Sequence, residues 1–292
     1  MTAQSPNSAP ANRESGPSDA MRYWDGVLDP QNLERAGSKG RRRGPTLEEE
    51  IEFTRTPDFE AAARWLENGD PSPAWILDLG AGLGSVSFAL ARRGHPVVAL
   101  DGSLARLRAM RDRAVRAGCA GSISCIVAAA EALPFRDGTV PAVYTKSVLI
   151  HTDLGRSARE LVRTLREGGR AALTEPQTGN PLVRTYRRWF APLAWRGITR
   201  YFDPAAQRVV LAAFGCADGP VRAIAPYYFF SFAAFMFQFG WPHVRLFGWS
   251  LRILHRLDAI LFWIIRPLRR WAWFGLIQIE KNPPGEGRGS KP

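Results

Sequence analysis

Cysteine and histidine are scarce in this sequence of 292 residues, which contains three of the first and four of the second. Cys119, Cys125 and Cys216 show neither the C-x-x-C spacing nor the mixed Cys/His pattern of a metal site. We therefore predict no bound metal and no disulfide framework, and this cysteine usage fits a reducing compartment.

The first 20 residues contain no apolar segment. They are polar and rich in Ser, Pro and Asn, and so differ from a secretory signal peptide. Residues 38–45, SKGRRRGP, add a flexible basic loop. We expect residues 1–45 to form a largely disordered tail, residues 46–292 to form one domain, and the protein to be cytoplasmic.

Acidic residues are scarce in the last third of the sequence. Residues 181–292 hold 16 Lys and Arg against 5 Asp and Glu, whereas residues 1–180 hold 23 against 22. Seven of the ten Trp lie in the same basic part. Basic surface is typical of nucleic-acid binding, of an anionic membrane surface, or of solubility alone. The interleaved aromatic residues favour a peripheral position at the inner face of a membrane.

No segment is a convincing membrane span. Residues 223–244 are uncharged, but Pro226 and Pro242 flank this stretch and Gln238 interrupts it. Residues 250–273 are the better candidate for a helix that lies on a membrane surface, with a break expected at Pro267. Its basic positions fall near one helical face: Arg252, Arg256, Arg266 and Arg270.

Short apolar runs alternate with helical patterns from residue 75 onward. Strands are predicted at residues 75–79, 97–100, 122–128, 142–149, 170–174, 221–227 and 273–280. Helices are predicted at residues 86–93, 104–117, 157–165 and 203–214. Because such helices join parallel strands through right-handed crossovers, we predict an α/β fold. Its core would be a Rossmann-like, seven-stranded, mostly parallel sheet with helices on both faces.

The most informative segment is residues 76–84, ILDLGAGLG, an apolar run followed by a glycine-rich turn. Close approach of the backbone to a ligand, and positive φ angles, are cheap only for glycine. A dinucleotide fingerprint has the spacing G-x-G-x-x-G, whereas Gly80, Gly82 and Gly84 follow G-x-G-x-G. The lysine that a P-loop requires after its glycine is absent.

Asp101 ends the next predicted strand, VVALD, where the ribose of a ligand lying across the strand ends would be. Its carboxylate can accept hydrogen bonds from both ribose hydroxyls. The alternative role is to cap the helix that follows Gly102 and Ser103. The spacing between Asp101 and the glycine loop favours the ribose role.

Five motifs follow one another in a fixed order: ILDLGAGLG, VVALD, AAAEALPF, VLIHTD and LVRTLREGGRAALTEP. With them, residues 74–176 resemble the class I S-adenosylmethionine-dependent methyltransferases, in particular the ubiquinone/menaquinone-biosynthesis type that acts on small molecules. The resemblance implies that S-adenosylmethionine binds across the carboxyl edge of the sheet. The positions that it implies for cofactor binding are Asp78, Gly80, Ala81, Gly82, Gly84, Asp101, Gly102, Ala129, Ala130, Glu131 and Thr145.

By the same resemblance, the three loop glycines line the methionine part and Asp78 orients their loop. Residues 131–133 lie near the adenine, and Thr145 and Lys146 contact the methionine moiety. The sequence departs from the family at Ala129, where an Asp usually reaches the adenine amino group, and at Pro141, which replaces an acid. These departures leave a non-catalytic relative that binds the cofactor as an alternative.

The acceptor pocket must come from segments outside the predicted sheet. Residues 177–203 and 229–270 are aromatic and basic, and we expect them to form a helical lid over a small, lipophilic acceptor. His151, just past the fourth strand, is the candidate general base, although a structural role in the turn is the alternative. Glu175, after the fifth strand, is the candidate acid.

A nucleic-acid methyltransferase is the alternative of a different kind. Base-amino methyltransferases carry Asn/Asp-Pro-Pro-aromatic after the fourth strand, where this chain has Thr145, Lys146 and Ser147. Nucleic acid is therefore the less favoured partner. The sequence gives no indication of the oligomeric state.

Overall fold

The computed structural model describes residues 22–23, 47–69, 72–189, 199–215, 225–231 and 244–281. Nearly all of the tail predicted at residues 1–45 lies outside these ranges. The described residues contain a seven-stranded sheet with the order β3-β2-β1-β4-β5-β7-β6. All neighbouring strands are parallel except β7, which is antiparallel to both β5 and β6. The predicted fold class is therefore confirmed.

The strand bounds follow the apolar runs of the sequence closely, apart from the end of β4 and the start of β5, and residues 221–224 of the sixth predicted strand lie outside the described residues. The strands are β1 (Ile76–Leu79), β2 (Val97–Asp101), β3 (Ile123–Val127), β4 (Val140–Lys146), β5 (Leu165–Pro176), β6 (Ala225–Tyr227) and β7 (Phe274–Glu280). β4 ends three residues earlier than predicted, because Ser147 takes a φ of 59° and a short 3-10 turn, η2 (Leu149–His151), follows. β5 begins five residues earlier, because Leu165 already pairs with Val140.

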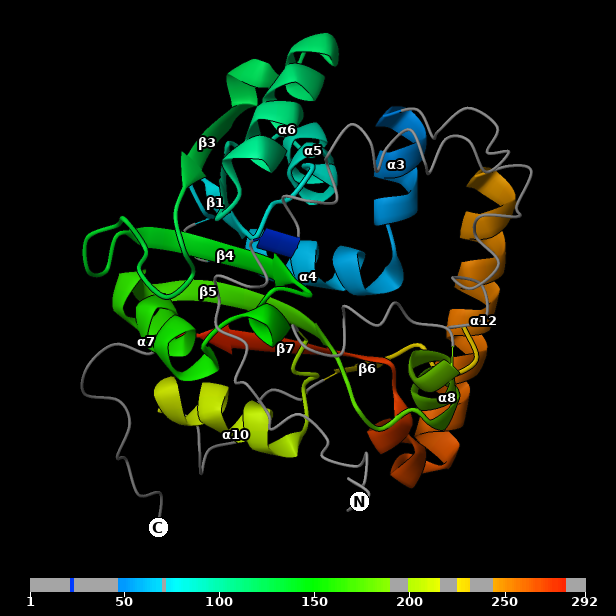
Figure 1. Ribbon diagram of the computed structural model, residues 1–292. Helices are drawn as coiled ribbons and strands as arrows, with labels where there is room; N and C mark the ends of the chain where they lie inside the picture. The colour runs from blue at the N-terminus through cyan, green and yellow to red at the C-terminus, as the bar shows by residue number, and fades with distance from the viewer. Residues whose placement is uncertain are drawn as a thin grey trace, which may run out of the picture.

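Helices cover both faces of the sheet (Figure 1). One face carries α4 (Pro57–Glu67), α5 (Ser85–Arg92) and α6 (Leu104–Arg116), and the other carries α7 (Leu154–Thr164) and α10 (Pro204–Ala213). Side chains along each strand alternate between the two cores, as the pleat requires. Ile76 packs on the α4–α5–α6 side, for example, and Leu77 on the α7–α10 side.

A helical layer lies beside the sheet at its β6 end. It consists of α12 (Val244–Ile264) and the 3-10 helix η4 (Arg266–Trp271), and α3 (Leu47–Thr54) lies between α5 and α12 (Figure 1). The break predicted at Pro267 is present, since α12 ends at Ile264 and Pro267 lies in η4. No helix in the described ranges is long and apolar enough to cross a bilayer.

Asp258 attaches α12 to the loop that follows β6. This fully buried carboxylate accepts hydrogen bonds from the backbone N–H groups of Phe229 and Phe230 at 2.8 Å and of Ser231 at 3.1 Å. The Ser231 hydroxyl donates to it as well, at 2.5 Å. Because a buried carboxylate is tolerated only when its oxygens are satisfied, this arrangement fixes the position of α12 beside the sheet.

Candidate active site

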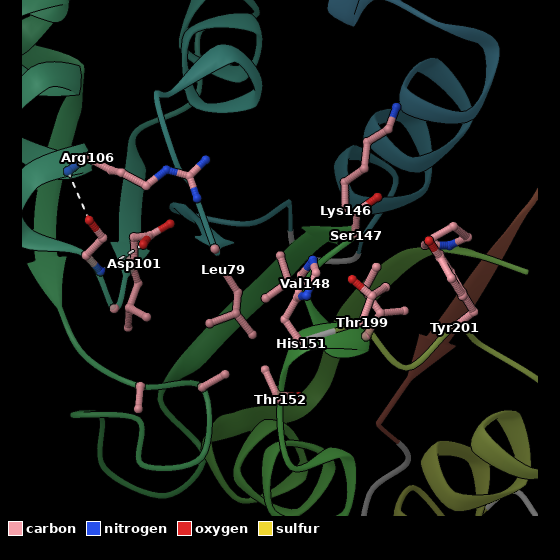
Figure 2. Close-up of a pocket in the computed structure, with 18 of the residues that line it drawn as sticks. Leu79, Asp101, Arg106, Lys146, Ser147, Val148, His151, Thr152, Thr199 and Tyr201 are labelled. Carbon is pink, nitrogen blue, oxygen red and sulfur yellow. Dashed lines mark hydrogen bonds between the residues drawn. The ribbon is translucent and has the colours of Figure 1, made fainter. Parts of the chain in front are cut away.

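A cavity of about 420 Å³ lies at the carboxyl edge of the sheet, where the ends of β1, β2, β4 and β5 meet. Figure 2 shows Asp101 and Arg106 at one end, Leu79 in the middle, and Lys146, His151 and Tyr201 toward the other end. This volume is within the range of small-molecule sites, roughly 300–1,000 Å³. The predicted site residues that line it are Gly80, Asp101, Gly102, Ala129, Ala130, Glu131 and His151.

Gly80 is the residue of the glycine loop that lines the cavity beside β1, whereas Ala81, Gly82 and Gly84 are not part of its lining. The N–H groups of Gly80 and Ala81 donate to the Leu100 carbonyl at 2.7 and 3.0 Å. Gly80 and Gly82 have φ angles of 74° and 57°. A Cβ on Gly80 would collide with the Val148 side chain, and one on Gly82 would lie 2.5 Å from Arg106 Nη2. Other residues would therefore be strained here and would lack room as well.

The Asp101 carboxylate lines the cavity and is 8% exposed. Its Oδ2 accepts the Gly82 N–H at 2.8 Å and its Oδ1 accepts the Ser103 N–H at 2.9 Å. The cap of α6 is Ser103, whose hydroxyl accepts the Arg106 N–H at 3.1 Å, so the capping role belongs to Ser103 and not to Asp101. Each carboxylate oxygen accepts about two hydrogen bonds, and each therefore retains the capacity for one hydroxyl group.

Asp78 lies behind the cavity wall. It is 2% exposed, and its Oδ2 accepts a hydrogen bond from the Ser87 hydroxyl of α5 at 2.5 Å. Burial raises the pKa of Asp78 to about 7, with the nearby charge of Asp101 acting in the same direction and the Ser87 hydrogen bond opposing it. Asp78 thus connects β1 to α5, whereas the loop itself is held by Asp101 and by the Leu100 carbonyl.

The segment after β3 forms the wall beyond Asp101. The Ala128 N–H donates to the Asp101 carbonyl at 3.2 Å, which places Ala129 and Ala130 beside that residue. The Glu131 carboxylate also lines the cavity, and its Oε1 accepts the Asp153 N–H at 2.8 Å. Glu131 therefore has one fixed oxygen, and its place near an adenine ring stays a prediction.

The turn after β4 lines the middle of the cavity, and its backbone is strained. Ser147 lines it in the left-handed region, and its N–H donates to the Thr174 carbonyl at 2.9 Å. Strain of this kind in a non-glycine residue gathers at functional sites. The predicted base His151 follows in η2 and lines the cavity, as Val148 and Ile150 do.

Glu175 holds this turn from behind. It is fully buried and does not line the cavity, and its Oε1 accepts the N–H groups of Val148 and Leu149 at 3.1 and 3.0 Å. Burial raises the pKa of Glu175 to about 8, although these backbone hydrogen bonds favour its charged form. Glu175 was predicted to be the acid near the acceptor; its carboxylate instead lies behind the turn that carries His151 and outside the cavity lining.

The residues at the end of β4 divide between core and cavity. Thr145 is fully buried and does not line the cavity, whereas Lys146 does. Lys146 Nζ lies 2.7 Å from Oδ2 of the fully buried Asp58, and the Tyr228 hydroxyl donates to the other oxygen of that carboxylate. Burial opposes ionisation of Asp58, but Lys146 holds the pKa of Asp58 below its usual value. The charge of Lys146 is thus already matched.

An aromatic wall closes the far half of the cavity. Its side chains come from α8 (Pro181–Trp189), from the loop before α10, and from the start of β7: Tyr186, Arg187, Thr199, Tyr201, Trp273 and Phe274. Sequence reasoning assigned residues 177–203 to the acceptor pocket but did not single out Arg187. Trp273 and Phe274 were expected in the last strand, and no local pattern in the sequence shows that this strand begins at the cavity.

The described part of the chain holds no group of His, Cys, Asp and Glu side chains that could bind a metal. In comparisons with known proteins, residues 77–173 match the family model of the methyltransferase domain. This part of the chain, which contains the glycine loop, Asp101 and the turn after β4, is thus similar to a methyltransferase domain.

The methyltransferase domain is similar to several bacterial enzymes. A ubiquinone/menaquinone biosynthesis C-methyltransferase of Geobacter sulfurreducens is 30% identical over 148 residues, which are 48% of this chain and 57% of that protein. A demethylmenaquinone methyltransferase of Thermobifida fusca is 37% identical over 102 residues, 34% of this chain and 42% of that protein. The chain thus spans about half the length of the curated relatives that it matches.

The similarity to solved structures extends beyond this domain. Geranyl diphosphate C-methyltransferase from Streptomyces coelicolor A3(2), in complex with Mg²⁺, geranyl diphosphate and S-adenosyl-L-homocysteine, has a TM-score of 0.54 at 20% identity. The alignment covers 94% of this chain and 99% of that one. At this level of identity the likeness shows a shared fold.

Proposed function

We propose that the protein transfers a methyl group from S-adenosylmethionine to a small, lipophilic acceptor. The observation that carries this proposal is a single cavity with two unlike halves. One half is formed by Gly80 of the glycine loop, Asp101 and Ala129, and the other by aromatic and apolar side chains that include Trp273 and Phe274. A cofactor and an apolar acceptor can therefore lie side by side, away from bulk water.

The residues of the first half fit S-adenosylmethionine. Asp101 has one acceptor position left on each oxygen for the two ribose hydroxyls, and Gly80 leaves the backbone open beside it. Ala129 and Ala130 offer a flat, apolar wall for the adenine. The cofactor supplies an already activated methyl group, so the protein has mainly to position the acceptor and exclude water.

Residues at the middle of the cavity would position the reacting atoms. An amine acceptor needs only to arrive unprotonated, whereas a hydroxyl or carbon acceptor gains from a general base. His151 is the base candidate, because it lines the cavity in the turn that Glu175 fixes. In this account His151 is the catalytic residue and Glu175 acts only through the turn.

A second proposal concerns the outer face of α12, which we assign to an anionic membrane surface at the cytoplasmic side. This face carries exposed apolar side chains at helical spacing: Trp249, Ile253, Leu257, Ile260 and Ile264. Trp249 is 56% exposed and the neighbouring Trp263 is 75% exposed. The exposed side chains of Arg252 and Arg256 flank this apolar face. A helix with apolar and basic positions side by side suits the boundary between lipid headgroups and acyl chains.

The test of the transfer reaction is an assay with tritiated S-adenosylmethionine and a fractionated extract of lipids, metabolites and RNA. We expect label to appear in an organic-soluble fraction with the wild-type protein and to be strongly reduced with the Asp101→Ala variant. Label in RNA alone would overturn the lipophilic acceptor and favour the nucleic-acid alternative. Binding of the cofactor without transfer to any fraction would favour a non-catalytic relative.

A further inference from the structure

Arg187 is a cation of the acceptor half that forms no ion pair with any acidic residue that the structure describes. It lies in the last turn of α8 and lines both the main cavity and a smaller cleft beside it. Its guanidinium carbon lies 3.3 Å from the centre of the Tyr201 ring, and its Nη1 donates to the Gln177 carbonyl at 2.9 Å. Within the described ranges no carboxylate forms an ion pair with Arg187, and its other N–H groups have no hydrogen-bond partner.

Two other partly buried arginines are paired with carboxylates. Arg93 pairs with Glu60 and Glu67 at 3.0 and 2.5 Å, and Arg170 pairs with Glu280 at 2.8 Å. In the cavity itself, Lys146 is paired with Asp58. A partly buried charge is costly unless it is paired, so an arginine left without an acid in a cavity indicates a ligand that brings the negative charge.

The surroundings of Arg187 indicate the geometry and the polarity of this ligand. Tyr201 covers one face of the guanidinium, which leaves the edge of the group for a planar, two-point contact with an oxyanion. Desolvation lowers the pKa of Arg187 to about 10, so the group remains a cation at neutral pH. The rest of this wall is aromatic or apolar, including Tyr186 and Trp273.

We infer that Arg187 is the specificity-determining residue for an acceptor that carries one acidic oxyanion, a carboxylate or a phosphate, on an apolar body. This inference rests on the proposed function, because it assigns the cofactor to the Asp101 half of the cavity and the acceptor to the Arg187 half. The acid group would lie against the guanidinium edge and the apolar body against the aromatic wall. The methylated atom would then face the turn that carries His151.

The test uses probes with the same ring system, the same position of substitution and unequal charge. 2-Naphthoate, 2-naphthyl phosphate and the neutral 2-naphthamide are titrated by calorimetry into the full chain, with and without S-adenosylhomocysteine. The variants are Arg187→Gln and, as the matched control, Arg184→Gln, which removes an exposed charge from the same helix. Thermal melting of each variant verifies that it is folded.

We expect the wild-type protein and Arg184→Gln to bind at least one of the two anions at least tenfold more tightly than 2-naphthamide. Arg187→Gln should lose this preference, bind the amide as the wild type does, and keep the affinity for S-adenosylhomocysteine. A preference for naphthoate alone or for the phosphate alone would identify which oxyanion the site takes.

Two results would overturn the inference. One is a wild-type protein that binds neither anion more tightly than 2-naphthamide, or an Arg187→Gln variant that keeps the anion preference of the wild type. The other is loss of S-adenosylhomocysteine affinity in Arg187→Gln, which would assign the guanidinium to the carboxylate of the cofactor. Failure of the wild type to bind S-adenosylhomocysteine would instead contradict the proposed function, while the probe titrations without it would still test Arg187.

Discussion

Asp101 has two tasks that a pair of substitutions can separate. Its oxygens hold the N–H groups of Gly82 and Ser103, and we propose that they also accept the ribose hydroxyls. Charge-assisted hydrogen bonds contribute roughly 1.5–3 kcal/mol each, so Asp101→Ala should weaken S-adenosylmethionine binding by about tenfold or more. Calorimetry measures this change.

The control for Asp101 is Ser103→Ala. It removes the cap of α6, at a cost of about 1 kcal/mol in stability, but leaves both Asp101 oxygens in place. Its affinity for the cofactor should remain close to that of the wild type. Equal losses in the two variants would mean that the local fold, and not the ribose contact, is what the Asp101 substitution disturbs.

Ala129 is the position where this chain lacks the acid that is usual in the class I methyltransferases that it resembles. Ala129 lines the cavity, and the neighbouring Glu131 already uses one oxygen on the Asp153 N–H. We therefore expect Ala129→Asp to supply a new acceptor for the adenine amino group and to tighten S-adenosylmethionine binding severalfold. Unchanged or weaker affinity in the same titration would indicate that Glu131 already performs this role.

Glu175 makes stability depend on pH. Its pKa is about 8 in the folded protein and near 4.5 when exposed. Between these values the folded form keeps a proton that the unfolded form has released, so stability falls as pH rises from about 4.5 to 8. Glu175→Gln keeps an oxygen for the Val148 and Leu149 N–H groups and cannot ionise.

We therefore expect Glu175→Gln to be more stable than the wild type at pH 8, by about 1–2 kcal/mol or a few degrees in Tm, and similar to it at pH 5. The slope should be reduced but not abolished, since the pKa of Asp78 is also raised, to about 7. The exposed Glu167→Gln substitution is the control and should keep the wild-type slope. Parallel melting curves for wild type and Glu175→Gln across this range would contradict the account.

At the scale of elements, α12 and η4 carry the proposed membrane contact. Each basic side chain near an anionic surface contributes about 1 kcal/mol, and buried aromatic faces add to this. We predict that the protein floats with anionic vesicles. Changing Arg252, Arg256, Arg266 and Arg270 to Gln should reduce binding by at least tenfold.

The matched control removes four exposed arginines elsewhere: Arg108, Arg111, Arg116 and Arg136. This variant has the same net charge as the first and should still float. A third variant, Trp249→Gln with Leu257→Gln, tests the apolar part of the same face. If the wild type floats with no lipid, α12 does not bind membranes and serves only to pack against the rest of the fold. If the four arginine changes leave flotation unaffected, the proposed electrostatic contribution to membrane binding is refuted.

The elements that the sequence predicts well are those whose signals are local. β1, α5 and β2 follow from short apolar runs separated by glycine turns, and their observed ends lie within a residue or two of the predicted ones. The start of β5 was missed because it depends on pairing between Leu165 and Val140. The end of β4 was not predicted because Ser147 adopts a positive φ, and no glycine in the sequence marks this position as a turn.

The candidate site divides in the same way. The glycine loop and Asp101 could be found from the spacing of their motifs, since one strand and one turn bring them together. The roles of Glu175 and Arg187 could not, because each depends on contacts with other elements. Glu175 accepts hydrogen bonds from N–H groups of the turn after another strand. Arg187 is notable because none of the carboxylates that the structure describes pairs with it, and this depends on three-dimensional packing.

At the scale of the whole molecule, the central claim is that the cavity at the carboxyl edge of the sheet binds S-adenosylmethionine and not a dinucleotide. The G-x-G-x-G spacing, the free capacity of Asp101 and the match of residues 77–173 to the methyltransferase domain all bear on this claim. The most direct measurement is a calorimetric titration of the full chain with S-adenosylmethionine and, separately, with NAD. We predict saturable binding of S-adenosylmethionine with one site per chain and no measurable binding of NAD. Preferential binding of NAD, or no binding of S-adenosylmethionine, would contradict the account.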